Sequence, residues 1–258
     1  MRALGWFARG EDSVARRWLS ALGTWMNRVR PNALRPIAAG GPPDPSAASQ
    51  EQALWTQLMD ERVIPEIRRL FDTSYRTIAP ASDPNVDQRA IDYLQGVRNR
   101  LSHIPDQVYA QIVADVERGI RDGQTIDEIA TAIQRRLTVA GSPYWAGRAR
   151  TIARTETVGA SNGGAFAAAV ARALEEGDAE ATKVWISTLD GRTRLEHREC
   201  DRQVQPLLQP FDVGGAQLMF PGDPSGPAHL VINCRCSILD IVGGMDLDWT
   251  NRQFQGAT

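Results

Sequence analysis

The chain reads TKVWISTLDGRTRLEHRECD over residues 182–201 and PGDPSGPAHLVINCRCSIL over residues 221–239. These two pieces hold all three cysteines and two of the three histidines of the sequence. Residues 182–188 are rich in β-branched and aromatic side chains, which predicts a strand, and Asp190-Gly191 favours a tight turn after it. We therefore expect residues 179–242 to form a small α+β domain.

Four side chains of this region have the chemistry of zinc ligands: His197, Cys200, Cys234 and Cys236. Thr193 and Glu196 have the spacing of a capping box, which predicts a short helix at Thr193. His197 and Cys200 then lie three residues apart on one face of that helix. Cys234 and Cys236 are two residues apart, which on a strand places them on the same side. Tetrahedral zinc takes four nitrogen and sulfur ligands, so these residues predict a structural zinc site, with His229 as a spare ligand.

Two other interpretations of the cluster stay open. In a metal-free interpretation, the cysteines are small buried side chains and His197 bonds to the backbone. Arg235 then pairs with a carboxylate, either Asp190 or Asp201. In the third interpretation two cysteines form a disulfide, which a reducing compartment disfavours.

Short motifs follow one another in a fixed order through this half of the chain. They are ARTET at 153–157, Ala160 to Asn162, KVW at 183–185, DGRTR at 190–194, His197, PGD at 221–223 and NCRC at 233–236. Together they resemble the phage Mu F-like family of minor head morphogenesis proteins, over residues 110–242. One position departs from the family, which usually has Gly after the Asp that follows the histidine. This chain has Arg202 after Asp201, so we expect the local turn to differ.

The resemblance implies a non-enzymatic virion component, a minor head or capsid morphogenesis protein of a tailed phage or phage-like particle. The implied partners are the portal protein and other head proteins, with indirect handling of packaged DNA and an oligomeric arrangement in the particle. The implied location is the capsid interior near the portal, and the host cytoplasm during assembly.

The composition of the chain agrees with an ordinary soluble protein. Its 258 residues carry a net charge of -2, which gives no general attraction to nucleic acid. No apolar run approaches the roughly 20 residues that span a bilayer, so we expect no stable membrane insertion. The N-terminal residues lack the pattern of a signal peptide, which favours a cytoplasm.

Residues 1–36 read as an amphipathic arm, followed by a linker at 37–49 that contains GGPPDP. Pro31 is expected to end the arm's helix. Such a tethered helix is free to reach a partner at a distance. Its apolar stripe is expected to pack on the main body or on a neighbouring subunit, with a peripheral membrane helix or a nucleic-acid contact as alternatives. The stripe consists of Val14, Trp18, Leu22, Trp25, Met26 and Val29.

Residues 50–178 read as a helical domain, so the fold class is α+β with a mainly helical body before the small C-terminal domain. Pro65 should end or kink the first helix, and Thr125 and Glu128 form a capping box. The last helix, from about Pro143 to Glu176, is rich in Gly and Ala, which predicts close approach of another backbone. Residues 243–258 form a tail.

Two enzymatic functions are alternatives to a structural role. A zinc-dependent nuclease of the His-Asn-His kind would use His229 and Asn233 beside a metal with an open position. However, residues 182–239 carry six basic and six acidic side chains, which makes a poor DNA clamp. Arg154 and Glu156 suit a nucleotide-sugar transferase, but an ion pair that orients the helix is the simpler interpretation, and no glycine-rich phosphate loop follows a strand.

Overall fold

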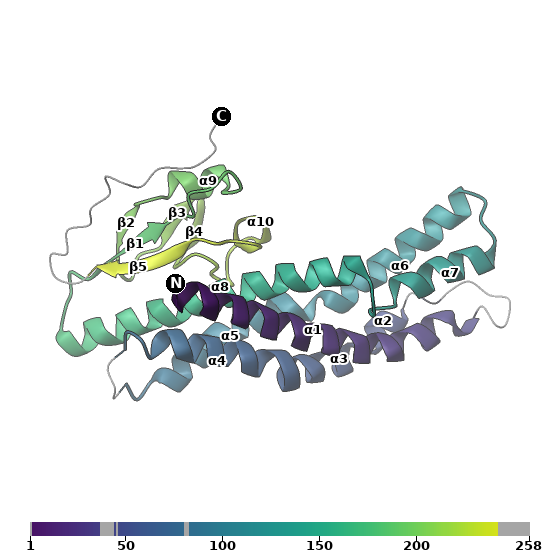
Figure 1. Cartoon of the computed structure of the whole chain (residues 1–258), viewed down its shortest axis with the longest axis horizontal. Coiled ribbons are helices and arrows are strands. Elements are labelled where there is room, and N and C mark those ends of the chain that lie inside the picture. The colour runs from purple at the N-terminus through teal and green to yellow at the C-terminus, as the bar shows by residue number, and fades with distance from the viewer. Residues whose placement is uncertain (1, 37–43, 45, 80–82, 242–258) are drawn as a thin grey trace. The chain divides into compact units, whose positions relative to one another are not determined.

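The structure, a computed structural model, describes residues 2–36, 44, 46–79 and 83–241. Its strands all follow the last long helix in the chain (Figure 1), which confirms the α+β class with a helical body before a small sheet-containing region. The linker core at 37–43 and the tail at 243–258 lie outside the described residues. No helix of the described residues has the length and apolarity needed to cross a membrane.

Among the described residues, the elements before residue 177 are helical. They are α1 Arg2–Leu34, α2 Ala47–Gln50, α3 Gln52–Leu58, the π-helical turn η2 Met59–Val63, α4 Ile64–Tyr75, α5 Val86–Ser102, α6 Ile104–Arg121, α7 Ile126–Arg136 and α8 Pro143–Glu176. The sheet-containing part follows, with β1 Thr182–Ile186, α9 Leu195–Glu199, β2 Val204–Pro206, β3 Phe211–Val213, β4 Ala216–Leu218, α10 Ala228–Val231 and β5 Ser237–Ile241.

The chain divides into two compact units, each built from separate segments. Unit 1 takes residues 1–12, 66–97 and 151–258, and unit 2 takes residues 13–65 and 98–150. The sequence predicts domains that are continuous stretches of chain. In the structure, unit 1 consists of three separate segments and unit 2 of two.

Unit 2 is organised around four buried tryptophans. Trp18 packs edge to face on Trp55 with ring centroids 6.3 Å apart, and Trp25 packs on Trp55 at 5.6 Å. Trp145 from α8 lies 6.3 Å from Trp18. The indole nitrogens of three of them donate to backbone carbonyls, for example Trp55 to Leu101 at 2.9 Å.

The apolar stripe of the predicted arm is therefore buried by the chain itself, and all six of its side chains are at most 1% exposed. The expectation of a free docking arm is wrong, because the partner of the stripe lies within unit 2. The alternative that the stripe packs on the main body is the one confirmed.

Pro31 and Pro65 both lie within helices, and only the expectation that Pro31 ends its helix is wrong. Helix α1 continues past Pro31 to Leu34, because a proline in the last turn removes only one backbone hydrogen bond. Before Pro65 the helix does not end; it widens into η2 and continues as α4, since a π-helical turn gives the proline ring room. The end of the predicted linker is also helical, as Ala47 and Ala48 are buried in α2.

The sheet of unit 1 has the order β2-β1-β5, with both pairings antiparallel. β1 lies in the middle, where Val184 faces Leu239 of β5 and Val204 of β2. β3 and β4 form a separate hairpin through Gly214-Gly215, both at positive φ. One core joins the two sheets, and it contains Trp185, Phe211, Val213, Leu218, Leu230 and the three cysteines.

The small residues of α8 allow close backbone contact, as predicted. A Cβ on Gly159 would lie 2.9 Å from the Gly222 carbonyl oxygen, which belongs to the predicted turn at 221–223. That turn is formed, with the Asp223 amide donating to Phe220 and Gly222 at a φ of 84°. The missing side chain at Gly159 thus sets how near this turn comes to the helix.

Candidate metal centre

Three of the four predicted ligands meet inside unit 1. The donor atoms of His197, Cys234 and Cys236 all lie within 4.8 Å of one another, and the three side chains are buried. The Nδ1 atom of His197 lies 3.4 Å from the Cys236 sulfur and 3.7 Å from the Cys234 sulfur. The indole of Trp185 packs at right angles on the imidazole with ring centroids 5.4 Å apart, which fixes its orientation.

Cys200 does not join this group. It is the C-cap residue of the five-residue helix α9, and its thiol donates to the Asp212 carbonyl of β3 at 3.1 Å. The expectation that Cys200 and His197 converge is therefore not met here, since the strand carbonyl holds the thiol. All three cysteines are free thiols.

The local helix also begins later than predicted. α9 starts at Leu195 with Arg194 as its N-cap and has no side-chain cap, so the capping box of Thr193 and Glu196 is wrong. The Thr193 hydroxyl donates instead to the Thr188 carbonyl, which closes the turn at Asp190-Gly191. Cys234 and Cys236 likewise lie just before β5 rather than on a strand, although both reach the same imidazole.

The distances within the cluster fit a tetrahedral metal ion. Zinc bonds of about 2.1 Å to nitrogen and about 2.3 Å to sulfur, at a tetrahedral angle, separate the two donors by about 3.6 Å. The observed 3.4 and 3.7 Å fall on either side of that value. Without a metal, the same contacts are thiol–imidazole hydrogen bonds, so the chemistry of the donors permits both states.

The three thiols have different acidities. Hydrogen bonds from Cys234 and then from His197 stabilise the Cys236 thiolate and lower its pKa, whereas the pKa of Cys234 is raised by the same bond and by burial. Burial raises the pKa of Cys200 to about 11. Metal ligands must be deprotonated, so Cys236 is the thiol best prepared for binding.

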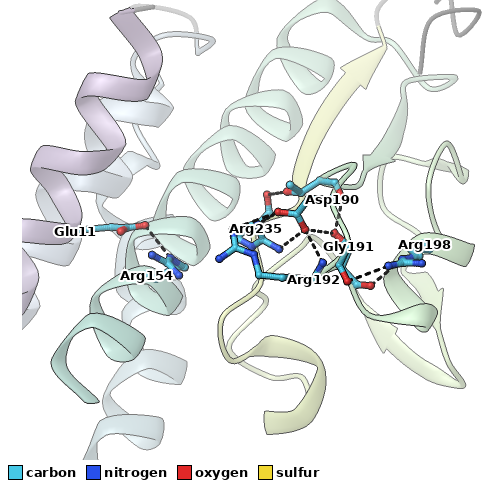
Figure 2. Close-up of polar contacts among 9 residues, drawn as sticks. Glu11, Arg154, Asp190, Gly191, Arg192, Arg198 and Arg235 are labelled. Carbon is cyan, nitrogen blue, oxygen red and sulfur yellow. Dashed lines mark hydrogen bonds and ion pairs between the residues drawn. The ribbon is translucent and has the colours of Figure 1, made fainter. Parts of the chain in front are cut away.

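An ion pair fixes the turn that precedes α9 to the segment that carries the cysteines. Arg235 binds both carboxylate oxygens of Asp190, one of them at 2.8 Å, and so confirms one of the two predicted partners. Figure 2 shows Asp190 between Arg235 and Arg192, while Arg198 reaches back to the Gly191 carbonyl. The Arg235 guanidinium holds the pKa of Asp190 well below its usual range.

Arg154 forms an ion pair that connects α8 to another segment of unit 1. Arg154 contacts Glu11 of α1, with nitrogen and oxygen 3.4 Å apart (Figure 2), while Glu156 is buried two residues further along α8. The ion pair therefore joins two segments of unit 1 and not two positions on one helix.

Asn162 connects α8 to the cysteine segment, a role that sequence patterns did not reveal. Its amide nitrogen donates to the Pro221 carbonyl at 2.8 Å and to the Cys236 carbonyl at 2.9 Å. Its oxygen accepts from the Ile238 amide at 3.2 Å. One buried side chain thus holds the turn at 221–223, the second cysteine and the start of β5.

Lys183, the only lysine in the chain, belongs to the KVW motif, but the motif did not predict its burial. It is fully buried on β1 and donates to the Met219 carbonyl at 2.8 Å. Its ammonium group lies 4.7 Å from the ring centroid of Phe166 and 5.0 Å from that of Phe211. Burial lowers the pKa of Lys183 to about 8, with Asp223 acting in the opposite direction.

Asn233 and His229, the residues of the nuclease alternative, are not members of the donor group of His197, Cys234 and Cys236. Asn233 directly precedes Cys234 and has a φ of 60°. Its backbone amide donates to the Thr155 hydroxyl at 3.0 Å. His229, the spare ligand, is exposed on α10 and is not part of the donor group.

Comparison with known proteins gives two matches. The profile of the family described as "Phage Mu protein F like protein" matches residues 110–239, half of the chain. The minor head protein GP7 of Bacillus phage SPP1 is 25% identical over 138 residues, which is 52% of this chain and only 41% of that relative. No solved structure matches the chain significantly. The matched range contains α8, strands β1 to β4, the first part of β5 and the whole His-Cys cluster, and the chain belongs to the family of phage Mu protein F like proteins.

Proposed function

We propose that this chain is a structural component in the morphogenesis of a phage head. The observation that carries the proposal is the family match over residues 110–239, supported by the relative named a minor head protein. The proposed partners are the portal protein and other head proteins, in an oligomeric arrangement at the capsid interior. A net charge of -2 favours contact with those proteins over direct binding of the packaged DNA.

Deletion and complementation of the gene in its phage or prophage test this role. We expect particles made without the chain to show fewer or defective heads, restored by the wild-type gene, and the chain to sediment with portal-containing heads. Normal heads and normal infectivity without the chain would contradict a morphogenetic role. If the chain sediments equally well with heads that lack the portal, the proposed contact with the portal is contradicted, but the role in head morphogenesis is not.

Within this function we propose a structural zinc ion held by His197, Cys234 and Cys236. The ion would tie α9 to the segment before β5, and so stabilise a small domain with many loop residues. Elemental analysis with a native free-thiol count tests it: one zinc per chain with two protected thiols is expected. A metal-free protein whose folding is unchanged by zinc would contradict it.

A zinc-dependent nuclease is the second candidate. The observation that favours it is the number of donors, since three protein ligands are typical of catalytic zinc and four of structural zinc. It predicts metal-dependent DNA cleavage that is lost in His229→Ala or Asn233→Ala. A head protein predicts no cleavage and no change of particle yield in either variant.

A further inference from the structure

We propose that the metal centre keeps one coordination position open, facing a small cavity lined by arginines that binds a water-sized anion such as chloride or hydroxide. This inference rests on the zinc ion proposed above and names the ligand that completes its coordination. It replaces the predicted fourth ligand, Cys200, by a ligand from solution.

The cavity adjoins the three donor residues directly. Its volume is about 20 Å³. Its lining includes the donors His197, Cys234 and Cys236 and the arginines Arg192, Arg194 and Arg235. A cavity of this size accommodates one water-sized group and does not hold a whole phosphate. The ligand that fits is therefore a small ion or a water molecule and not a nucleotide.

The protein supplies three donors to this site and holds the fourth candidate elsewhere. The Cys200 thiol is engaged by the Asp212 carbonyl at 3.1 Å. Among the described residues, the group of mutually close histidine, cysteine and carboxylate donors contains only His197, Cys234 and Cys236. A tetrahedral ion bound by these three has one position left, and the cavity is the space beside them.

The charges around the cavity favour an anion in that position. Two thiolates neutralise a zinc ion, so the centre itself contributes no net charge. Three arginines line the cavity and none of the lining residues is acidic. Asp190 neutralises Arg235, whereas Arg194 donates to a neutral acceptor, the Ile232 carbonyl, at 2.5 Å. The remaining positive charge stabilises a negative ligand close by.

Cobalt substitution of the full chain tests the open position. The charge-transfer absorption of Co²⁺ grows with the number of bound thiolates, and the visible bands respond to any ligand that enters the first shell. We expect the intensity of two thiolates and a saturable spectral shift on titration with azide, a linear anion of which a single terminal nitrogen enters the open position. Cys200→Ser should leave both the spectrum and the azide response unchanged.

Arginine variants test the role of the cavity. Arg194→Gln keeps a donor for the Ile232 carbonyl but removes the charge, and should weaken azide binding about three- to fivefold. Arg202→Gln removes one charge from the same unit outside the cavity lining and is the matched control, with azide affinity unchanged. Equal affinities in the two variants would overturn the role of the arginines.

The outcomes separate this inference from the metal site itself. Failure of the chain to take up cobalt or zinc would overturn both proposals. Three other results would leave the zinc site standing: metal uptake with three thiolates bound, loss of one thiolate in Cys200→Ser, and a spectrum that azide does not change. Each of those results would overturn the open position.

Discussion

Replacing Asn162 by alanine is expected to destabilise unit 1 strongly. The side chain is 5% exposed and makes three hydrogen bonds, at 2.8, 2.9 and 3.2 Å. A hydrogen bond contributes about 1 kcal/mol net, and a buried polar group left without a partner costs about 1–3 kcal/mol. Asn162→Ala leaves two carbonyls and one amide unpaired, so we expect a loss of about 3–5 kcal/mol in the free energy of unfolding, part of a total near 5–15 kcal/mol.

Urea denaturation measures this loss from the shift of the midpoint at constant slope. Hydrogen exchange at the amides of β1 and β5 assigns the loss to unit 1, because those amides report the local opening of its sheet. Asn99→Ala, at an exposed position of α5, is the matched control and should change stability by less than about 0.5 kcal/mol. A loss below about 1 kcal/mol in Asn162→Ala would refute the reasoning.

Asn162→Asp separates hydrogen bonding from shape. The variant keeps the size of the side chain and the acceptor for Ile238, but places carboxylate oxygen against the carbonyls of Pro221 and Cys236. Burial should raise the pKa of the new carboxyl above its unfolded value near 3.9, so its contribution is favourable in acid and lost as the pH rises. Part of the stability should therefore return below pH 4.

Three further predictions concern other features. Gly159→Ala should lose about 1–3 kcal/mol, because the new Cβ would meet the Gly222 carbonyl, while Gly147→Ala on the same helix has open space and should gain up to about 1 kcal/mol; thermal unfolding compares them. Burial lowers the pKa of Lys183 to about 8 in the folded state, whereas an unfolded lysine keeps its proton up to about pH 10.4. The free energy of unfolding of the wild type should therefore rise between pH 8 and 10.4, by up to about 3 kcal/mol. Denaturation at pH 7.5 and 10 should show this rise in the wild type and not in Lys183→Met. Arg202→Gly relieves a left-handed φ of 67° but also removes the ion pair to the buried Asp201 carboxylate at 3.3 Å, so we expect no rise of the midpoint in urea denaturation. A higher midpoint would contradict the contribution of that ion pair.

The elements predicted best from the sequence depend on neighbouring residues. The bounds Pro143 and Glu176 of α8 were predicted at the observed residues, and the capping box of Thr125 and Glu128 is present with both of its hydrogen bonds. Helix caps and helix ends depend on residues within one turn of each other, so they can be predicted from neighbouring positions in the sequence. At Thr193 the same signal was misleading, since a carbonyl five residues earlier took the hydroxyl.

The departure at Arg202 shows how a turn can persist without its usual residue. The sequence suggested that the turn would differ because the family's glycine is absent. In the structure Arg202 adopts the left-handed conformation that glycine favours, and its amide donates to the Trp185 carbonyl at 2.8 Å. The hydrogen bond to β1 keeps the backbone path, which residue preference alone could not reveal.

The candidate site was predicted in composition but not in geometry. His197, Cys234 and Cys236 meet as donors, whereas Cys200 turns away because β3 supplies an acceptor from another part of the chain. Asn162 and Lys183 were not foreseen for the same reason. Their hydrogen-bond partners lie between 36 and 76 residues away, and no local pattern encodes such a contact.

The discontinuous make-up of unit 1 has a consequence for the order in which the chain folds. Gly10 packs against Leu70, and a Cβ there would also lie 3.2 Å from Thr157, while Glu11 pairs with Arg154. During synthesis, Gly10 and Glu11 can make their contacts with Thr157 and Arg154 only after more than half of the chain has left the ribosome. Contacts so distant in sequence slow folding and leave an apolar helix uncovered meanwhile. Nascent chains of this protein should therefore depend on chaperones more than their final compactness suggests.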